Sequence, residues 1–196
     1  MNASLAYIVE QFENSARLKQ EFGRKKAETI FAAAQLMIER LNAGSKLLIC
    51  GNGGSAADAQ HFAAEMIGRL QRDRDPIAAI ALTTDSSNLT AIGNDYLFED
   101  VFWRQVQALG TAGDVLIVLS TSGNSKNVIK AVQTAKTKKI KTVALLGRDG
   151  GELAGLVDLA LIVPAQSSMR IQEVHITTIH MWCELIEDAL FPNERV

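Results

Sequence analysis

Five short apolar runs stand out along the chain, and polar residues do not alternate inside them. They occupy residues 47–50, 77–82, 115–119, 142–146 and 159–163. Uninterrupted runs of this kind are typical of strands that are buried on both faces, as in the centre of a parallel sheet. The hydrophobic pattern therefore predicts five buried strands.

Helical periodicity fills most of the remaining chain. Apolar residues at spacings of three and four predict helices over 3–20 and 25–42, with Gly23 closing the first of them. Further helices are expected at about 55–70, 87–108, 125–139 and 168–190. Strands and helices that alternate in this way predict a parallel sheet with right-handed crossovers.

The expected fold class is therefore α/β: a doubly wound, five-stranded parallel sheet flanked by helices, with helices at the amino terminus. We expect a single domain over 1–196, in which 1–44 form a helical extension and 45–196 form the α/β core and the last helix. The helix at 168–190 is apolar around most of its circumference. We expect it to be buried, partly against another subunit.

Composition narrows the class of protein. The chain has 196 residues, of which 20 are basic and 22 acidic, so its net charge of −2 argues against nucleic acid as a partner. It contains no leader-like start and no apolar run near the ~20 residues that span a bilayer. Cys50 and Cys183 lie in apolar runs and are expected to be free thiols. We expect a cytoplasmic protein without membrane partners.

Candidate chemistry follows two of the expected strands, where ligands bind in open parallel sheets. The first loop, 51–55, reads Gly-Asn-Gly-Gly-Ser, and its exposed amides would favour an anion, with Ser55 expected to cap the next helix. The second loop, 120–125, reads Ser-Thr-Ser-Gly-Asn-Ser and suits a phosphate. Either loop alone is equally consistent with a plain strand-to-helix turn. Their presence in one sheet favours phosphate binding.

The three histidines of the chain differ in their surroundings. His61 and Glu65 are four residues apart on one helix, so they share a face that could hold a metal or a substrate, although an ordinary surface pair has the same spacing. On the last helix, Gln172 and His180 lie within about 80° of each other and can face one site. His175 lies about 140° from His180 and is expected to be structural.

Three segments together, 51–65, 120–125 and 170–173, resemble the sugar-isomerase (SIS) domain, and within it the phosphoheptose isomerase family. The likeness runs through the whole chain and implies a flavodoxin-like SIS fold. It also implies a cytoplasmic homotetramer that converts sedoheptulose 7-phosphate to D-glycero-D-manno-heptose 7-phosphate. That reaction would be the first step of ADP-heptose synthesis for the lipopolysaccharide core.

The resemblance also implies roles for individual residues. One zinc ion per subunit would be held by His61, Glu65, Gln172 and His180. The substrate would contact Asn52, Gly53, Gly54, Ser55, Glu65, Asn94, Asp95, Ser120, Thr121, Ser122, Ser125 and Gln172. Glu65 would act as general base and His180 as general acid, because isomerisation through an enediol needs one group to remove a carbon-bound proton and another to protonate the carbonyl oxygen. Met169 departs from the acidic residue of some family members.

Two rival interpretations remain. Relatives of this family associate with replication initiators without being enzymes, and the ending 190–192 is similar to theirs. That branch typically has a small polar residue at the position of Glu65, so Glu65 favours the isomerase. A sugar-phosphate sensor is the other rival, but such sensors usually carry a DNA-binding domain, for which this chain has no room.

Overall fold

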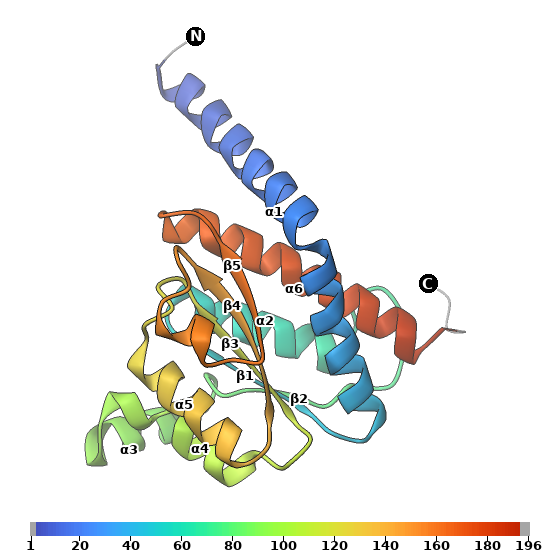
Figure 1. Ribbon diagram of the computed structural model, residues 1–196, viewed down its shortest axis with the longest axis vertical. Coiled ribbons are helices and arrows are strands. Elements are labelled where there is room, and N and C mark those ends of the chain that lie inside the picture. Colours follow the sequence, from blue (N-terminus) through green and yellow to red (C-terminus); the bar gives the residue numbers. More distant parts are fainter. Residues whose placement is uncertain (1–2, 193–196) are drawn as a thin grey trace.

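The computed structural model describes residues 3–192 and contains one parallel sheet between two helical layers (Figure 1). Its strands are β1 (Leu47–Gly51), β2 (Ala79–Ala81), β3 (Val115–Ser120), β4 (Lys141–Gly147) and β5 (Leu159–Val163). Their order in the sheet is β2-β1-β3-β4-β5 and every neighbouring pair is parallel. This is the flavodoxin-like order of a doubly wound sheet, so the predicted fold class is confirmed. The division into domains stays a prediction, and its ends, 1–2 and 193–196, lie outside the described residues.

Two hydrophobic cores follow from the alternation of side chains along the strands. Leu47, Ile49 and the residues in phase with them pack against α1 (Ala3–Asn42), α2 (Gly54–Ile67) and α6 (Ser168–Leu190). Leu48, Cys50 and their counterparts pack under α4 (Trp103–Leu109) and α5 (Lys126–Thr137). Because both faces of the sheet are covered, the strands are uninterrupted apolar runs.

The amino-terminal helices predicted at 3–20 and 25–42 are one continuous helix, α1. Gly23 does not end it, because a glycine inside a helix costs only about 1 kcal/mol, and the buried Phe22 beside it packs on the core. The carboxyl half of α1 lies on the body of the molecule, whereas its amino-terminal half projects away from it (Figure 1).

The prediction of a single helix at 87–108 is also wrong, because this segment is divided into shorter elements. The segment forms α3 (Ser86–Asp95), a short 3-10 turn η1 (Phe98–Asp100) and α4, joined by extended backbone at Leu97. The Asp85 side chain caps α3 by accepting the N–H of Asn88 at 2.9 Å. No residue of α3 is fully buried, and only Leu89 and Ile92 pack in part on the core, so little core contact holds the helix beyond its last turn.

The edge strand β2 is shorter than the predicted 77–82, since the Ile77 N–H bonds the Met66 carbonyl at the end of α2 instead of a strand. Helix α6 matches its predicted bounds and is largely buried within its own chain, where it packs against α1 and α2. Burial against another subunit stays a prediction. Within residues 3–192, no helix combines the length and the apolar character needed to cross a membrane.

Candidate active site

The two candidate loops meet at the carboxyl ends of two central strands. They follow β1 and β3, which are neighbours, and Gly51 pairs in register with Leu119. This is the point at which the strand order reverses, and ligands of open α/β sheets bind there. The topology thus brings together two loops that are far apart in the sequence.

Glycines shape the first loop. Gly53 is the N-cap of α2 and has a φ of 57°, in the left-handed region that glycine adopts at low cost. At Gly54, a Cβ atom would lie 2.5 Å from Nε2 of Gln172, so any other residue here would displace this side chain of α6. Ser55 is buried inside the first turn and does not cap the helix as predicted, because Gly53 already occupies the cap position.

Asn52 is held by a residue of α5 that no sequence pattern indicates. Its side-chain amide exchanges two hydrogen bonds of 2.9 Å with that of Asn127, a buried residue of α5. The sequence shows only a polar residue near the start of a helix, so nothing there indicates this pairing. The pair ties the first loop to the helix that follows the second loop.

The second loop is organised by its own hydroxyl groups. Ser120 Oγ accepts the N–H of Gly123 at 3.1 Å and lies 3.1 Å from Ser125 Oγ. Ser168, at the start of α6, donates to Thr121 Oγ1 at 3.3 Å. Ser122 Oγ accepts the N–H of Asn124 at 3.2 Å. The hydroxyl groups lie at the amino terminus of α5, where the helix dipole favours an anion.

Three side chains from two helices converge beside these loops. His61 Nε2 lies 3.0 Å from Glu65 Oε1 and 3.3 Å from Nε2 of His180 on α6. Candidate ligand atoms of the three residues all lie within 4.8 Å of one another. We call this cluster, His61, Glu65 and His180, the triad. It is partly open, since 43% of the His61 side chain is exposed.

The triad suits a zinc ion. Two imidazoles and one carboxylate are the ligand set of several catalytic zinc sites. Nitrogens bound to a tetrahedral zinc at about 2.0–2.1 Å lie about 3.3 Å apart, which is the distance between the Nε2 atoms of His61 and His180. Gln172, the fourth predicted ligand, lies against Gly54, about two helical turns before His180. Its role as a ligand stays a prediction.

A half-buried carboxyl group lies one turn before His61. Oδ2 of Asp58 is buried and has no hydrogen-bond partner among residues 3–192. Burial raises the pKa of Asp58 to about 6, and the charge of His61 opposes this rise. No sequence pattern singles out Asp58, because its burial depends on how α2 packs.

His175 is fully buried, and its Nε2–H donates to the carbonyl oxygen of Leu146 at 3.1 Å. Burial lowers the pKa of His175 to about 4, so the ring is neutral at pH 7. These contacts fit the structural role predicted for it.

Three predicted or unusual positions lie on the surface. Asn94 and Asp95 are at the exposed end of α3, where Asn94 Nδ2 donates to Asp95 Oδ1 at 2.8 Å. Their contact with substrate stays a prediction. Met169 is 65% exposed at the start of α6.

Known proteins resemble this chain over nearly all of its length. The profile of the SIS domain family matches residues 10–147. The phosphoheptose isomerase of Aromatoleum aromaticum is 53% identical over 190 residues, which cover 95% of this chain and 96% of that protein. The phosphoheptose isomerase of Neisseria meningitidis serogroup A is 53% identical over 186 residues, or 93% and 94% of the two chains.

Solved structures of phosphoheptose isomerases also resemble this chain in fold. Phosphoheptose isomerase GmhA from Neisseria gonorrhoeae superposes with a TM-score of 0.90 at 50% identity, covering 95% of this chain and all of that one. A phosphoheptose isomerase from Francisella tularensis gives a TM-score of 0.91 at 39% identity, with coverage of 95% and 99%. The chain therefore belongs to the phosphoheptose isomerase family, within the wider group of proteins that share the SIS domain.

Proposed function

We propose that this chain is the aldose–ketose isomerase that converts sedoheptulose 7-phosphate to D-glycero-D-manno-heptose 7-phosphate, the first step of ADP-heptose synthesis for the lipopolysaccharide core. The observation that carries the proposal is the triad beside two anion-suited loops. Helices α2 and α6 run side by side, with Gln172 against Gly54 at one end and His180 against His61 further along. About 10 Å of helix separates the two contacts, which leaves room for a phosphate at the loops and reacting carbons at the triad.

Glu65 and His180 perform the proton transfers in this proposal. Glu65 removes a proton from C1 while His180 protonates the carbonyl oxygen at C2, and an enediol forms. Glu65 then returns its proton to C2, and His180 recovers a proton from the C1 hydroxyl as the aldehyde forms. The 3.0 Å contact between Glu65 and His61 holds the carboxylate toward the centre of the site.

A zinc ion fits this arrangement. His61, Glu65 and His180, joined by Gln172, would hold one ion per subunit. When bound, it would supply a positive charge that stabilises the negative charge developing on the substrate oxygens. Glu65 would serve as ligand and base, so its two oxygens would divide these tasks.

Substrate recognition falls to the loops. The hydroxyl groups of Ser120, Thr121, Ser122 and Ser125 bind the phosphate in this proposal, with help from the helix dipole of α5. The first loop and the remaining predicted contacts would bind the sugar. These are Asn52, Gly53, Gly54, Ser55, Glu65, Asn94, Asp95 and Gln172.

We extend the proposal to a cytoplasmic homotetramer. Five large apolar side chains in the projecting half of α1 are exposed, among them Phe12 at 75% and Tyr7 at 59%. An exposed apolar stripe of this kind is typical of a helix that associates with other copies. The buried free thiols of Cys50 and Cys183 suit a reducing compartment.

The test of the function is an isomerase assay on purified protein supplied with Zn²⁺. We expect turnover of sedoheptulose 7-phosphate, and a loss of about 10²- to 10⁴-fold in Glu65→Gln, the range expected for a general base. Glu39→Gln, at an exposed carboxylate at the end of α1, is the matched control and should keep full activity. Full activity in Glu65→Gln would exclude Glu65 as the base. An inactive wild type that binds a replication initiator would favour the non-enzymatic alternative. The phosphoheptose isomerases that resemble this chain do not support that alternative.

A further inference from the structure

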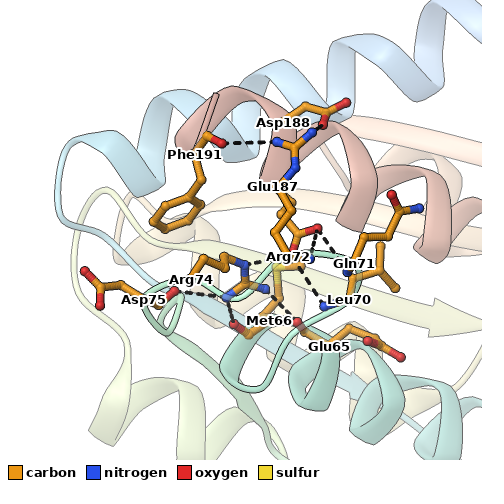
Figure 2. A network of polar contacts seen from close by, with 10 residues as sticks. All are labelled: Glu65, Met66, Leu70, Gln71, Arg72, Arg74, Asp75, Glu187, Asp188 and Phe191. Atoms are coloured by element: carbon orange, nitrogen blue, oxygen red, sulfur yellow. Dashed lines mark hydrogen bonds and ion pairs between the residues drawn. The ribbon is translucent and has the colours of Figure 1, made fainter. Parts of the chain in front are cut away.

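A buried arginine closes the carboxyl end of α2. The Arg74 side chain is 0% exposed. Its Nη2 donates to the carbonyl oxygen of Glu65 at 2.8 Å, and its Nη1 donates to those of Met66 at 2.9 Å and Asp75 at 3.0 Å (Figure 2). Carbonyls in the last turn of a helix have no partner within the helix, and that end carries a partial negative charge. One guanidinium group thus satisfies two carbonyls of the last turn, including that of Glu65 itself.

The partner of this arginine lies on α6. Arg74 Nε donates to Oε1 of Glu187 at 2.9 Å, and the Glu187 side chain is only 3% exposed. The same carboxylate accepts the main-chain N–H groups of Leu70, Gln71 and Arg72 at 3.1–3.4 Å. Glu187 therefore binds both the arginine and the loop that leads out of α2, as Figure 2 shows.

The connected helices are those that build the triad. His61 and Glu65 stand on α2, and His180 stands on α6, two turns before Glu187. Glu65 is in the last turn of α2, where a helix frays first when its carbonyls lose their partners. The buried pair therefore bears directly on the backbone of Glu65, whereas His61 is one turn further inside the helix.

Stability alone does not account for such a pair. Removing two charges from water costs about as much as their attraction returns, and apolar replacements of a buried pair are often neutral or stabilising. What apolar side chains cannot reproduce is the set of directed hydrogen bonds to the Glu65 carbonyl and to the loop after α2. A misplacement of about 1 Å at a reacting group can cost ~100-fold in rate.

We propose that Arg74 and Glu187 are positioning residues that set the place of Glu65 relative to His180, and through it the geometry of the triad. The inference rests on the proposed roles of Glu65 and His180. Neither Arg74 nor Glu187 touches the substrate in this proposal. They act through the main chain of α2 and through the spacing of the two helices.

The test replaces both charges at once, in the double variant R74M/E187L, so that no unpaired charge stays buried. The double variant also loses the hydrogen bonds to three N–H groups and three carbonyls, so we expect a lower melting temperature. Zinc affinity and kinetics are therefore measured at a temperature at which the metal-free variant is fully folded. Zn²⁺ affinity, measured by competition with a chromophoric chelator, should fall about 10- to 100-fold, as for other residues that orient metal ligands. The kcat should fall at least about tenfold with little change in KM, because the reacting groups and not the phosphate loops are displaced.

The control is the neighbouring ion pair between Arg72 and Asp188. Arg72 also donates to the carbonyl oxygen of Phe191 at 3.1 Å, but its side chain bonds no carbonyl of α2. The variant R72Q/D188N should keep wild-type zinc affinity and kcat. In R74K, which keeps the charge but lacks the fork of donors, both quantities should be intermediate. R74K also provides the measurement if the double variant does not fold.

The outcomes separate the two proposals. Wild-type zinc affinity and kcat in a folded R74M/E187L, or in R74K if the double variant does not fold, would overturn the positioning role and leave the isomerase proposal standing. If the wild type shows no isomerase activity but the variants still bind zinc more weakly than it does, the positioning role is upheld and the proposed reaction is rejected. Equal losses in R72Q/D188N would also overturn the inference, because the effect would then be a general loosening of this region.

Discussion

The buried imidazole of His175 allows a quantitative prediction of how the free energy of unfolding depends on pH. The ring is inaccessible to water, its Nε2–H donates to the Leu146 carbonyl, and its Nδ1 has no partner among residues 3–192. Burial lowers the pKa from 6.5 to about 4 in the folded protein, although the bond to Leu146 partly opposes this. The unfolded chain therefore binds a proton at a higher pH than the folded chain does.

The sign and the size of the effect follow from linkage. Between pH 6.5 and 4 the unfolded state holds more protons at this site, so the free energy of unfolding falls as the pH falls. Each pKa unit corresponds to about 1.4 kcal/mol, and His175 should account for a loss of about 3 kcal/mol between pH 7 and pH 4. This contribution is fully present above pH 6.5.

The perturbation is His175→Gln, which keeps an N–H donor for Leu146 and removes the titrating group. Urea unfolding of both proteins at pH 7, 6, 5 and 4, at one protomer concentration, gives the two stability curves. We expect the variant to gain about 3 kcal/mol relative to the wild type from pH 7 to pH 4. Asp58, whose raised pKa acts in the opposite direction, is present in both proteins and cancels in the difference. Parallel curves would refute the reasoning.

Three further predictions concern the loops and the thiols. Gly54→Ala should displace the Gln172 side chain and raise KM about tenfold, the cost of one lost hydrogen bond, with the melting temperature unchanged. An unchanged KM would contradict substrate binding by Gln172. Gly123 has a φ of 69°, so Gly123→Ala should lower the free energy of unfolding by at least about 1–2 kcal/mol, measured in urea. Burial raises the pKa of both Cys50 and Cys183. A thiol reagent at pH 8 should therefore label neither in the native protein and both after unfolding.

Local signals in the sequence were sufficient for some elements and misleading for others. The five apolar runs identify five buried strands, because a parallel sheet covered on both faces leaves no polar alternation. Gly23 misleads, since a glycine weakens a helix but does not end it when the flanking residues pack on a core. The segment 87–108 misleads because no residue of α3 is fully buried and only Leu89 and Ile92 pack in part on the core, so the continuation of that helix depends on contacts that the sequence does not show.

Some features of the candidate site could likewise be predicted from local sequence, and others could not. The spacing of His61 and Glu65 indicates their proximity, because residues four apart share one face of any helix. The 3.3 Å approach of His180 to His61, across 119 residues, exists only because α2 and α6 pack side by side. A charged residue on a helix predicted to be buried needs a partner or a purpose, so Glu187 could have been singled out from the sequence. Its partner Arg74 lies 113 residues away, in a loop with no periodic pattern.

The sequence by itself determined the class of fold, the two phosphate-suited loops and the proximity of His61 and Glu65 on α2, since each depends on residues that are neighbours along the chain. The tertiary structure alone decided which loops meet, that His180 completes the triad, and that Arg74 and Glu187 hold the ends of two helices together. The physical reason is that burial and the pairing of distant polar groups depend on which faces come into contact. That choice is made by the packing of the whole core and not by any local pattern.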